Sequence, residues 1–582
     1  MNIRRSALLA LAIAAAIVAG CAGDPNGSPL PTSAAPAQGS TLFVAAVGTA
    51  GSGSSCASPY RVAAGANTAD EIQETIEQAE DIGATTVHIC AGNYVLEHRL
   101  VVSEALRIAG AGIGETVLDG NHEVTIIQSG FVESDSGRLD LSDMTLQHGV
   151  AEALAPIEGG EGGILMSGGA VTAWSLTTNR VAFVDNSGAA CGGAVSLLSN
   201  IIALVEGAQL YDLSPRDREA YLNNTRSTFT DTTFVDNVAY LAGGAIGGLS
   251  LDLEEFTDIE IVFTVETFFC GSPPMSVAGS TFTRNEALVG GAIYNVEPRT
   301  AMEIGVELGL GNDIAMARPF TSRRMKELYT KPSVVITSSH FTDNRSVSRN
   351  LLGLEDVPGI GGGAVFSSGV VNVSGSTFSG NGSPEVPADD LDVTLEGGAI
   401  AACGYLGTSN TYEENRAIIG GALSIGTMPF DIFYAFCTVG ALENLASVAH
   451  LDLYRSDSYL NNSAEYLGGA IMSWARGRSS GATRLRFSGN SAGSTQTVAI
   501  AADSCETRDS LRLVTSWARA GSYVEGAAGE VTCDTDFSPL AANGPANRHF
   551  GSKLNLGAAN VSAQDLATLL QVRQAIEGLL RR

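Results

Sequence analysis

The sequence predicts an all-β fold: a single-stranded, right-handed parallel β-helix with a capping helix before it and a second helix after it. Two recurring motifs predict this fold, because units that repeat along a chain bury a core only against their neighbours. The first is an aromatic residue followed three positions later by Asn, and it occurs at Phe183/Asn186, Phe234/Asn237, Phe282/Asn285, Phe341/Asn344, Phe378/Asn381, Tyr412/Asn415, Tyr459/Asn462 and Phe487/Asn490. The second is Gly-Gly-Ala followed by an aliphatic residue, with glycine pairs at Gly168-Gly169, Gly192-Gly193, Gly243-Gly244, Gly290-Gly291, Gly362-Gly363, Gly397-Gly398, Gly420-Gly421 and Gly468-Gly469.

Each motif supplies what a coil of short parallel strands needs. Asn tolerates left-handed backbone angles, so we expect it at a tight corner, with its amide in a ladder with the equivalent amides of adjacent coils. The aromatic residue is expected to point inward and to stack. The glycine pair suits a second corner where two backbones approach closely, and Ala is the largest side chain expected to fit inside it.

The spacing of the motifs supports the same architecture. Adjacent Gly-Gly-Ala motifs start 24, 51, 47, 72, 35, 23 and 48 residues apart, which fits one or two coils of about 24 residues plus insertions. A dozen or so coils, each rising about 4.8 Å, would form a rod of roughly 60 Å. The insertions should project as loops, and the longest are residues 197–228, 247–277, 296–332, 345–360, 382–395 and 424–454.

The paired motifs resemble the repeats of chlamydial polymorphic outer membrane proteins and of bacterial β-helix proteins of the pectin-lyase-like superfamily. The resemblance covers about Leu42 to Ile500. It implies the parallel β-helix and, before it, a helix that covers the open end of the first coil, where core and strand edges would otherwise be exposed. The superfamily includes pectate lyases, polygalacturonases and other polysaccharide enzymes, so the resemblance implies the fold and leaves the activity open.

The first 40 residues predict a lipid-anchored protein. Arg4 and Arg5 precede an apolar run that ends in Val18-Ala19-Gly20-Cys21, which has the pattern of a bacterial secretory signal with a lipobox. The run is too short for a retained transmembrane helix, which is the alternative interpretation. Cys21 is therefore the expected lipidation site. Similarity to other bacterial lipoproteins implies that Ala22 favours the outer membrane, and residues 22–40 are expected to form a flexible tether.

The remaining elements follow in order along the chain. Strands are expected at Leu42–Val44, Val87–Ile89, Leu100–Val102, Leu106–Ala109 and Val117–Asp119, with the coils proper beginning at Asp140. Apolar residues at helical spacing predict a helix over residues 68–82, capped by Asn67 or Thr68. A second helix is expected over residues 565–580. The predicted divisions are the signal peptide (1–20), the tether (21–40), the cap and first coils (41–120), the β-helix with its insertions (121–535) and the C-terminal tail (536–582).

Composition excludes some partners. The net charge of −29 argues against nucleic acids and anionic membrane surfaces, which bind clustered Lys and Arg. The membrane is therefore expected as a partner only through the lipid. The sequence leaves the oligomeric state open.

The cysteines indicate an oxidising compartment. Nine Cys leave eight after lipidation, an even number suited to disulfides. Pairing each with its nearest neighbour gives the hypothesis Cys56 with Cys90, Cys191 with Cys270, Cys403 with Cys437, and Cys505 with Cys533. Eight cysteines allow 105 pairings, so other connectivities stay open.

No constellation of catalytic residues is evident. Hydrolysis needs two carboxylates that face one groove, and uronide elimination needs a base beside acidic groups that hold Ca²⁺. The strands after Gly-Gly-Ala instead carry Ser196, Gly247, Tyr294, Phe366, Ala401, Ser424 and Met472. Asp185, Asp236 and Asp343 recur before the motif Asn and are interpreted as solvated corner residues. We predict no cofactor. The acidic pairs Asp389-Asp390 and Asp534/Asp536 are candidates for Ca²⁺, and the scattered His residues predict no metal site.

Three functional hypotheses remain. The first is a lipid-anchored cell-envelope protein that binds carbohydrate, or another envelope or host component, through its insertions without cutting it. The second is a lyase or hydrolase of acidic polysaccharide whose site is built from the insertions. The third is a structural envelope protein.

Overall fold

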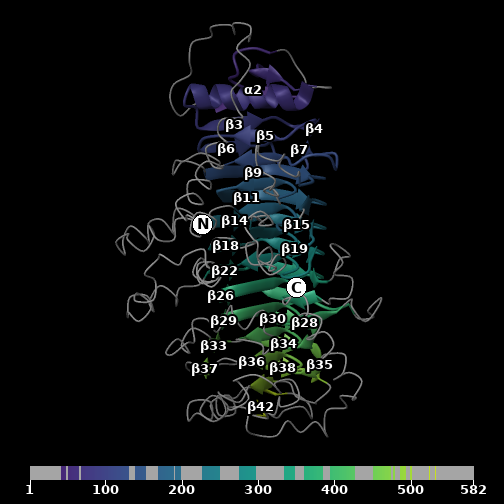
Figure 1. The fold of residues 1–582 in the computed structure, drawn as a ribbon. Helices are drawn as coiled ribbons and strands as arrows, with labels where there is room; N and C mark the ends of the chain where they lie inside the picture. Colours follow the sequence, from purple (N-terminus) through teal and green to yellow (C-terminus); the bar gives the residue numbers. More distant parts are fainter. Residues whose placement is uncertain are drawn as a thin grey trace, which may run out of the picture.

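The computed structural model describes residues 41–46, 50–63, 67–129, 138–151, 168–188, 191–197, 226–248, 274–295, 333–347, 359–384, 393–425, 450–455, 457–473, 476–478, 486–492, 498–500, 523–524 and 531–532. Figure 1 shows these residues as a long stack of short strands with a helix, labelled α2, across its end. The strands of adjacent coils pair in parallel along the whole stack. The predicted parallel β-helix is therefore confirmed.

The helix at the N-terminal end is α2 (Thr68–Asp81), and it forms the predicted cap (Figure 1). Its Ile72, Ile76 and Ala79 are fully buried against the first coils because they share one helical face. Asn67 takes the N-cap position, as predicted for one of the two candidates, but its side chain makes no capping hydrogen bond. Instead, the Ala69 N–H donates to a Glu97 carboxylate oxygen at 3.0 Å. A carboxylate there also interacts favourably with the positive end of the helix dipole.

The coils begin earlier than Asp140, because the strands before it already stack in parallel. β3 pairs with β6, β4 with β7 and β5 with β8, and both β6 and β7 pair with β9. The elements of this region are β1 (Thr41–Ala45), β2 (Arg61–Val62), β3 (Thr86–Ile89), β4 (Gly92–Val95), β5 (Leu100–Val102), β6 (Leu106–Ala109), β7 (Thr116–Asp119), β8 (Ile127–Ser129) and β9 (Arg138–Gln147).

Each later coil contributes to four columns of stacked strands, named here ladders A to D in the order in which the chain passes through them. Ladder A follows Gly-Gly-Ala and contains β10 (Val171–Ala173), β13 (Val195–Leu197), β17 (Ile246–Gly248), β21 (Ile293–Asn295), the first parts of β26 (Val365–Ser374) and β29 (Ile400–Thr408), β32 (Leu423–Ile425), β36 (Ile471–Ser473), β40 (Val498–Ile500) and β42 (Val531–Thr532). Ladder B contains the first parts of β9 and β11 (Ser175–Val184), β14 (Ser227–Thr230), β18 (Met275–Ala278), β22 (Val334–Thr337), the second parts of β26 and β29, β33 (His450–Arg455) and β37 (Arg476–Arg478).

Ladder C holds the aromatic motif residues, and ladder D follows the motif Asn. Ladder C contains the second parts of β9 and β11, β15 (Thr233–Val235), β19 (Thr281–Thr283), β23 (His340–Thr342), β27 (Thr377–Ser379), β30 (Thr411–Glu413), β34 (Ser458–Leu460), β38 (Arg486–Ser488) and β41 (Tyr523–Val524). Ladder D consists of two separate sheets. The first contains β12 (Ser187–Gly188), β16 (Val238–Ala239), β20 (Glu286–Ala287) and β24 (Arg345–Ser346), and the second contains β25 (Gly359–Gly361), β28 (Thr394–Glu396), β31 (Arg416–Ile419), β35 (Ser463–Leu467) and β39 (Ser491–Ala492).

The motif Asn residues form a continuous amide ladder at the corner between ladders C and D. Asn285 is typical: its side-chain oxygen accepts from both the backbone and the side-chain N–H groups of Asn237, at 3.1 and 2.9 Å. Its own side-chain nitrogen donates to Asn344 at 2.9 Å and to the Phe234 carbonyl at 3.1 Å. The expected ladder is confirmed. Equivalent side-chain bonds link, in order, Asn186, Asn237, Asn285, Asn344, Asn381, Asn415, Asn462 and Asn490.

The left-handed corner residue is not the motif Asn but the residue before it. The φ angles at this position are 52° at Asp185, 57° at Asp236, 52° at Arg284 and 54° at Asp343. In the later coils they are 64° at Gly380, 57° at Glu414 and 53° at Asn461. The predicted left-handed corner is therefore wrong at every one of the positions Asn186, Asn237, Asn285, Asn344, Asn381, Asn415 and Asn462.

The reason is that one residue cannot perform both tasks that the prediction gave to the motif Asn. Each motif Asn is buried, with its amide directed along the ladder. The Asn side chain can bond to the backbone of the next coil only while it stays inside the corner. The preceding residue must therefore make the turn. The exposed residue before the Asn takes the left-handed angle, and the Asn itself keeps its side chain inside.

A second polar ladder runs along the corner between ladders B and C. Its members occupy one buried column, in which each backbone N–H donates to the side-chain oxygen of the next coil. The sequence analysis did not identify this column. Its signal is a polar residue two positions before six of the eight motif aromatics, and these residues are Thr232, Ser280, Ser339, Ser376, Asn410 and Asp457.

Between these two corners, the motif aromatics stack as predicted. Successive rings from Phe183 to Tyr459 lie with centroids 4.5–5.0 Å apart and planes within 13° of parallel. All of these rings are fully buried in the core. Stacked aromatic pairs contribute about 0.5–1.5 kcal/mol each beyond the area that they bury.

The Gly-Gly corner meets the predicted requirement for close backbone approach. Gly243 has φ 66°, and a Cβ there would lie 2.1 Å from the Ile246 carbonyl oxygen of its own turn. A Cβ on Gly244 would lie 2.2 Å from the Gly291 carbonyl oxygen of the next coil. The first glycine is thus needed for the turn, and the second for stacking.

Replacing one ladder amide should destabilise the coils. Asn285→Ala leaves the buried Asn237 N–H groups without their acceptor, and each such loss costs about 1–3 kcal/mol. We expect a clear fall in Tm, measured by circular dichroism. The neighbouring substitution Arg284→Gly is the control, because Gly380 and Gly489 occupy this left-handed corner in other coils. Equal effects of the two substitutions would contradict the role given to the ladder.

Candidate functional site

Four of the six predicted insertions lie at one junction, between ladders A and B, whereas those at 345–360 and 382–395 interrupt ladder D. Residues 198–225, 249–273, 296–332 and 426–449 all start after a ladder A strand and end before a ladder B strand. The strand ends that border them lie in register: Leu197 beside Gly248, and Met275 beside Val334. Their attachment points are therefore stacked along one flank of the rod, which we name the A–B flank. The insertions themselves lie outside the described residues.

The coil does not need these insertions in order to close. In β26 and β29 the chain passes from ladder A to ladder B within one continuous strand. Only Trp174 separates β10 from β11. Three coils thus cross the same junction with no long segment, so the added residues in the other coils are not required by the fold.

Ladder A is buried on both faces. Its inward residues, such as Ile293 and Val365, belong to the core, and the residues that alternate with them face outward. The Tyr294 and Phe366 rings of the outward column stack at 5.3 Å, and burial raises the pKa of the Tyr294 hydroxyl. The outward residues that the sequence analysis singled out lie in register as expected and are buried; they are Ser196, Gly247, Tyr294, Phe366, Ala401, Ser424 and Met472.

One carboxyl group borders this outward column and was missed by the sequence analysis. Glu396, in β28, accepts a 2.8 Å hydrogen bond from the Ser424 hydroxyl. Burial raises the pKa of Glu396 to about 8, and the Ser424 hydrogen bond opposes this rise only in part. The side chain keeps some exposure to solvent. In the sequence, Glu396 is a single Glu before a Gly-Gly pair, and nothing in that pattern indicates a buried carboxyl group with a raised pKa.

The recurring acidic residues lie at solvated corners, as interpreted from the sequence. Asp185 is exposed, and Asp236 accepts two 2.7 Å hydrogen bonds from the Arg284 guanidinium of the next coil. These hydrogen bonds raise the pKa of Arg284. Exposed pairs of this kind contribute little to stability. The other acidic pairs, Asp389-Asp390 and Asp534/Asp536, lie outside the described residues.

The structure brings together two His residues that the sequence analysis treated as scattered. His148 follows β9, and its Nδ1 lies 3.1 Å from an Asp119 carboxylate oxygen at the end of β7. Its Nε2 lies 3.9 Å from a carboxylate oxygen of Asp185, which follows β11. The ring of His122 lies 4.5 Å from that of His148, centroid to centroid. His122, His148 and Asp185 each place one ligand atom within 4.8 Å of the others.

Asp119 is held firmly in this cluster. Besides His148, it accepts from the Gln147 side chain at 2.8 Å and from the Asn121 N–H at 2.9 Å. Burial raises the pKa of Asp119, but these hydrogen bonds outweigh it, and the pKa lies below its ordinary value. Asp119 is therefore ionised at neutral pH.

A second buried acid ends the polar ladder of the B–C corner. Asp457 accepts from the Asn410 N–H at 2.8 Å and from the Tyr405 hydroxyl at 3.3 Å. The Tyr405 and Tyr412 hydroxyls lie 2.6 Å apart. Burial raises the pKa of Asp457 to about 7, while its hydrogen-bond donors lower it. The aligned residues of the preceding coils are neutral, so Asp457 is the one acid among the described residues of this column.

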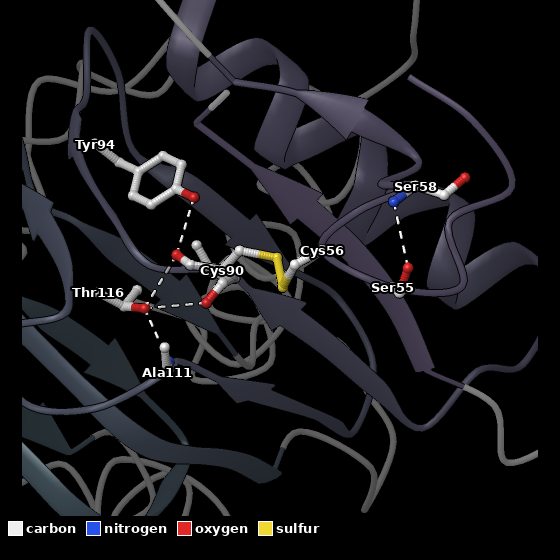
Figure 2. The surroundings of a disulfide bond; sticks show 8 residues. Ser55, Cys56, Ser58, Cys90, Tyr94, Ala111 and Thr116 are labelled. Atoms are coloured by element: carbon white, nitrogen blue, oxygen red, sulfur yellow. Dashed lines mark hydrogen bonds between the residues drawn. A yellow bond between two sulfur atoms is a disulfide. The ribbon is translucent and has the colours of Figure 1, made fainter. Parts of the chain in front are cut away.

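One predicted disulfide is present. Cys56 and Cys90 are bonded across a separation of 34 residues, and a closed loop of that length contributes about 3–4 kcal/mol. Figure 2 shows the Tyr94 and Thr116 hydroxyls directed at the Cys90 carbonyl oxygen, to which they donate at 3.0 and 3.1 Å. The disulfide thus ties the loop after β1 to the end of β3.

The other cysteine predictions are not settled by the described residues. Cys191 and Cys403 are each disulfide-bonded. The partners proposed for them, Cys270 and Cys437, lie outside the described residues, as do Cys505 and Cys533. The lipidation site Cys21 and the predicted helix over residues 565–580 also lie outside. Within the described part of the chain, no helix has the length and apolarity needed to cross a bilayer.

Comparisons with known proteins assign no activity to the chain. No protein-family model and no curated protein sequence matches it. Among solved structures, the mannuronan C-5 epimerase AlgE4 A-module of Azotobacter vinelandii is 11% identical, with 73% of this chain and 92% of that chain covered and a TM-score of 0.28. PfbA, a surface adhesin of Streptococcus pneumoniae, is 10% identical, with 75% and 80% covered and a TM-score of 0.28. The A. vinelandii AlgE6 A-module is 13% identical, with 73% and 95% covered and a TM-score of 0.25.

The buried acid should make stability depend on pH. The pKa of Asp457 is about 7 in the folded protein and about 3.9 in an unfolded chain. The folded state therefore holds an extra proton between these values, and its contribution to stability is lost as pH rises through about 7. We expect the Tm of Asp457→Asn, relative to that of the wild type, to be higher at pH 8 than at pH 5. A difference that stays constant with pH would contradict this assignment.

Proposed function

We propose that the protein is a lipid-anchored cell-envelope β-helix that binds carbohydrate, or another envelope or host-surface component, through the insertions of its A–B flank. The observation that supports this most strongly is the contrast between coils at the same junction. β26 and β29 cross it without interruption, whereas four other coils add long segments there. Segments that the fold does not require, attached in register along one flank of a rigid rod, form an extended surface for recognition.

The anchor is part of the same proposal. The lipobox that ends at Cys21 would place acyl chains at the start of the mature chain, and the tether over residues 22–40 would hold the rod away from the membrane. Acyl chains favour membrane binding by about 0.8 kcal/mol for each buried CH₂ group.

Polysaccharide cleavage is the second candidate function, and Glu396 is the observation that favours it. Its carboxyl group has a pKa raised to about 8 and lies against Ser424 beside the outward column of ladder A. A carboxyl group that keeps its proton at neutral pH is suited to act as a general acid.

The recognition proposal predicts that an insertion can be removed without loss of the fold. Asn295 pairs with Ser367 and Val334 with Val371, so Ser-Gly-Val, copied from residues 368–370, can replace residues 296–333. We expect the variant to keep the wild-type circular dichroism spectrum and to lose binding on an array of neutral and acidic glycans. A second variant replaces residues 426–450 by Ser-Gly, which is copied from Cys403-Gly404 with Ser in place of Cys. Binding that is unchanged in both variants would contradict a role for the flank.

A depolymerisation assay on acidic polysaccharides, run beside the array, separates the two candidate functions. Cleavage products from the wild type that are absent with Glu396→Gln would establish the enzyme. Binding without products supports recognition.

The anchor predicts a change of location. Cys21→Ser removes the thiol that receives the lipid, so we expect the variant to leave the membrane fraction, while Cys56→Ser, which affects only a disulfide, should remain there. Immunoblots of fractionated cells measure this. Protease treatment of intact cells then reports which face of the membrane is occupied. Retention of Cys21→Ser in the membrane fraction would contradict lipid anchoring.

A further inference from the structure

We propose that His122, His148 and Asp185 bind a divalent transition metal ion such as Zn²⁺, with Asp119 as the residue that positions His148. Two imidazoles and a carboxylate form a ligand set typical of Zn²⁺ and its neighbours, whereas Ca²⁺ and Mg²⁺ prefer oxygen ligands alone. This inference is independent of carbohydrate binding, because the cluster lies at the C–D corner of the first coils and not on the A–B flank.

The ring of His148 is already oriented for metal binding. Its Nδ1 lies 3.1 Å from an Asp119 carboxylate oxygen, and a carboxylate beside one ring nitrogen favours the tautomer that carries the N–H there. The other ring nitrogen, Nε2, is directed towards Asp185 at 3.9 Å and is the atom that faces an incoming ion. A carboxylate that fixes the tautomer and orientation of a ligating His is the usual second shell of protein zinc sites.

The backbone holds the three ligands in place before any ion arrives. Asp119 pairs with Gln147, and Gln147 with Val184, so His148 and Asp185 occupy the same corner position in successive coils. His122, His148 and Asp185 all have left-handed backbone angles, with φ of 57°, 53° and 52°.

Hydrogen bonds between coils fix these corners further. The His122 N–H donates to the His148 carbonyl at 2.8 Å, and the His148 N–H donates to the Val184 carbonyl at 3.1 Å. The Asp185 N–H donates to the Val235 carbonyl at 3.0 Å. Because each ligand is supported by the coil below it, little conformational entropy remains to be lost when an ion binds.

One pair of ligand atoms already lies near the separation that a tetrahedral site requires. Zn–N and Zn–O distances of about 2.0–2.1 Å place two ligand atoms about 3.4 Å apart. The His148 Nε2 and Asp185 oxygen, now 3.9 Å apart, therefore need to approach by about half an ångström. The Asp185 side chain is 57% exposed, so it can rotate without disturbing the core. Three protein ligands leave the fourth position to water or to a donor from a binding partner.

Bound metal would join three consecutive coils near the capped end of the rod. His122, His148 and Asp185 come from the turns after β7, β9 and β11. An ion that binds only the folded corner stabilises it by mass action, so Zn²⁺ should raise Tm as its concentration exceeds the dissociation constant.

The test is a titration of the tag-free, disulfide-oxidised chain with ZnCl₂, followed by calorimetry and by Tm. We expect saturable binding of one Zn²⁺ that is lost in the double variant His122→Asn/His148→Asn, because Asn is compatible with the left-handed corner that Asn461 adopts in a later coil. Asp119→Asn should weaken binding by about 10- to 100-fold while leaving the ligands in place. CaCl₂ should not compete.

The matched control is His98→Ala. His98 also pairs with a carboxylate, Asp70, at 2.8 Å, but it lies in the cap and is not part of the three-residue cluster. We expect its removal to leave Zn²⁺ binding unchanged. Binding that survives the double His variant, or a wild type that shows no saturable binding, would overturn the proposal. Loss of binding in His98→Ala with retention in the double variant would do the same.

Discussion

The fold depends on satisfying the polar groups of a thin core at every corner. A coil that turns three or four times must bury backbone N–H groups at places where no strand partner can reach them, and each unsatisfied group would cost about 1–3 kcal/mol. The Asn ladder from Asn186 to Asn490 solves this problem, because each amide serves both the backbone and the amide of an adjacent coil. The aromatic stack and the Gly-Gly corner then have fixed positions relative to that column.

This constraint is local to each pair of coils, which explains why the chain tolerates such different insertions. A coil contributes its ladder residues in register whether its A–B junction contains one residue, as between β10 and β11, or the 296–332 segment. Because loop-closure entropy rises only slowly with length, a long segment adds little cost once the coils around it are stable. The A–B flank can therefore vary in sequence and length while the rod stays the same.

The corner columns are also where the coils differ chemically. At the B–C corner the column changes from hydroxyl groups to Asn410 and then to Asp457, whose buried acid needs the tyrosine and asparagine donors around it. At the C–D corner the left-handed position is His148 in one coil and Asp185 in the next. The left-handed residue of the C–D corner keeps its side chain accessible to solvent at His148 and Asp185, so its chemistry can change while the stacking around it is preserved.

The sequence by itself determined the coil: the inward aromatic, the amide ladder, the Gly-Gly corner and the capping helix follow from local patterns that repeat or from helical spacing. The Cys56–Cys90 disulfide was only one hypothesis among 105 possible pairings, and the structure confirms it. It also contained a signal for Asp457, which precedes Tyr459 as Ser280 precedes Phe282, although that column was not recognised. Which residue makes the left-handed turn could not be predicted, because Asn suits both the turn and the ladder until the burial of its amide is known.

Only the tertiary structure decided which residues meet across coils. His122, His148 and Asp185 come together because backbone hydrogen bonds set the register between coils, and the unequal segments between these residues hide that register from the sequence. The raised pKa of Glu396 likewise arises from burial beside Ser424, which no spacing along the chain encodes.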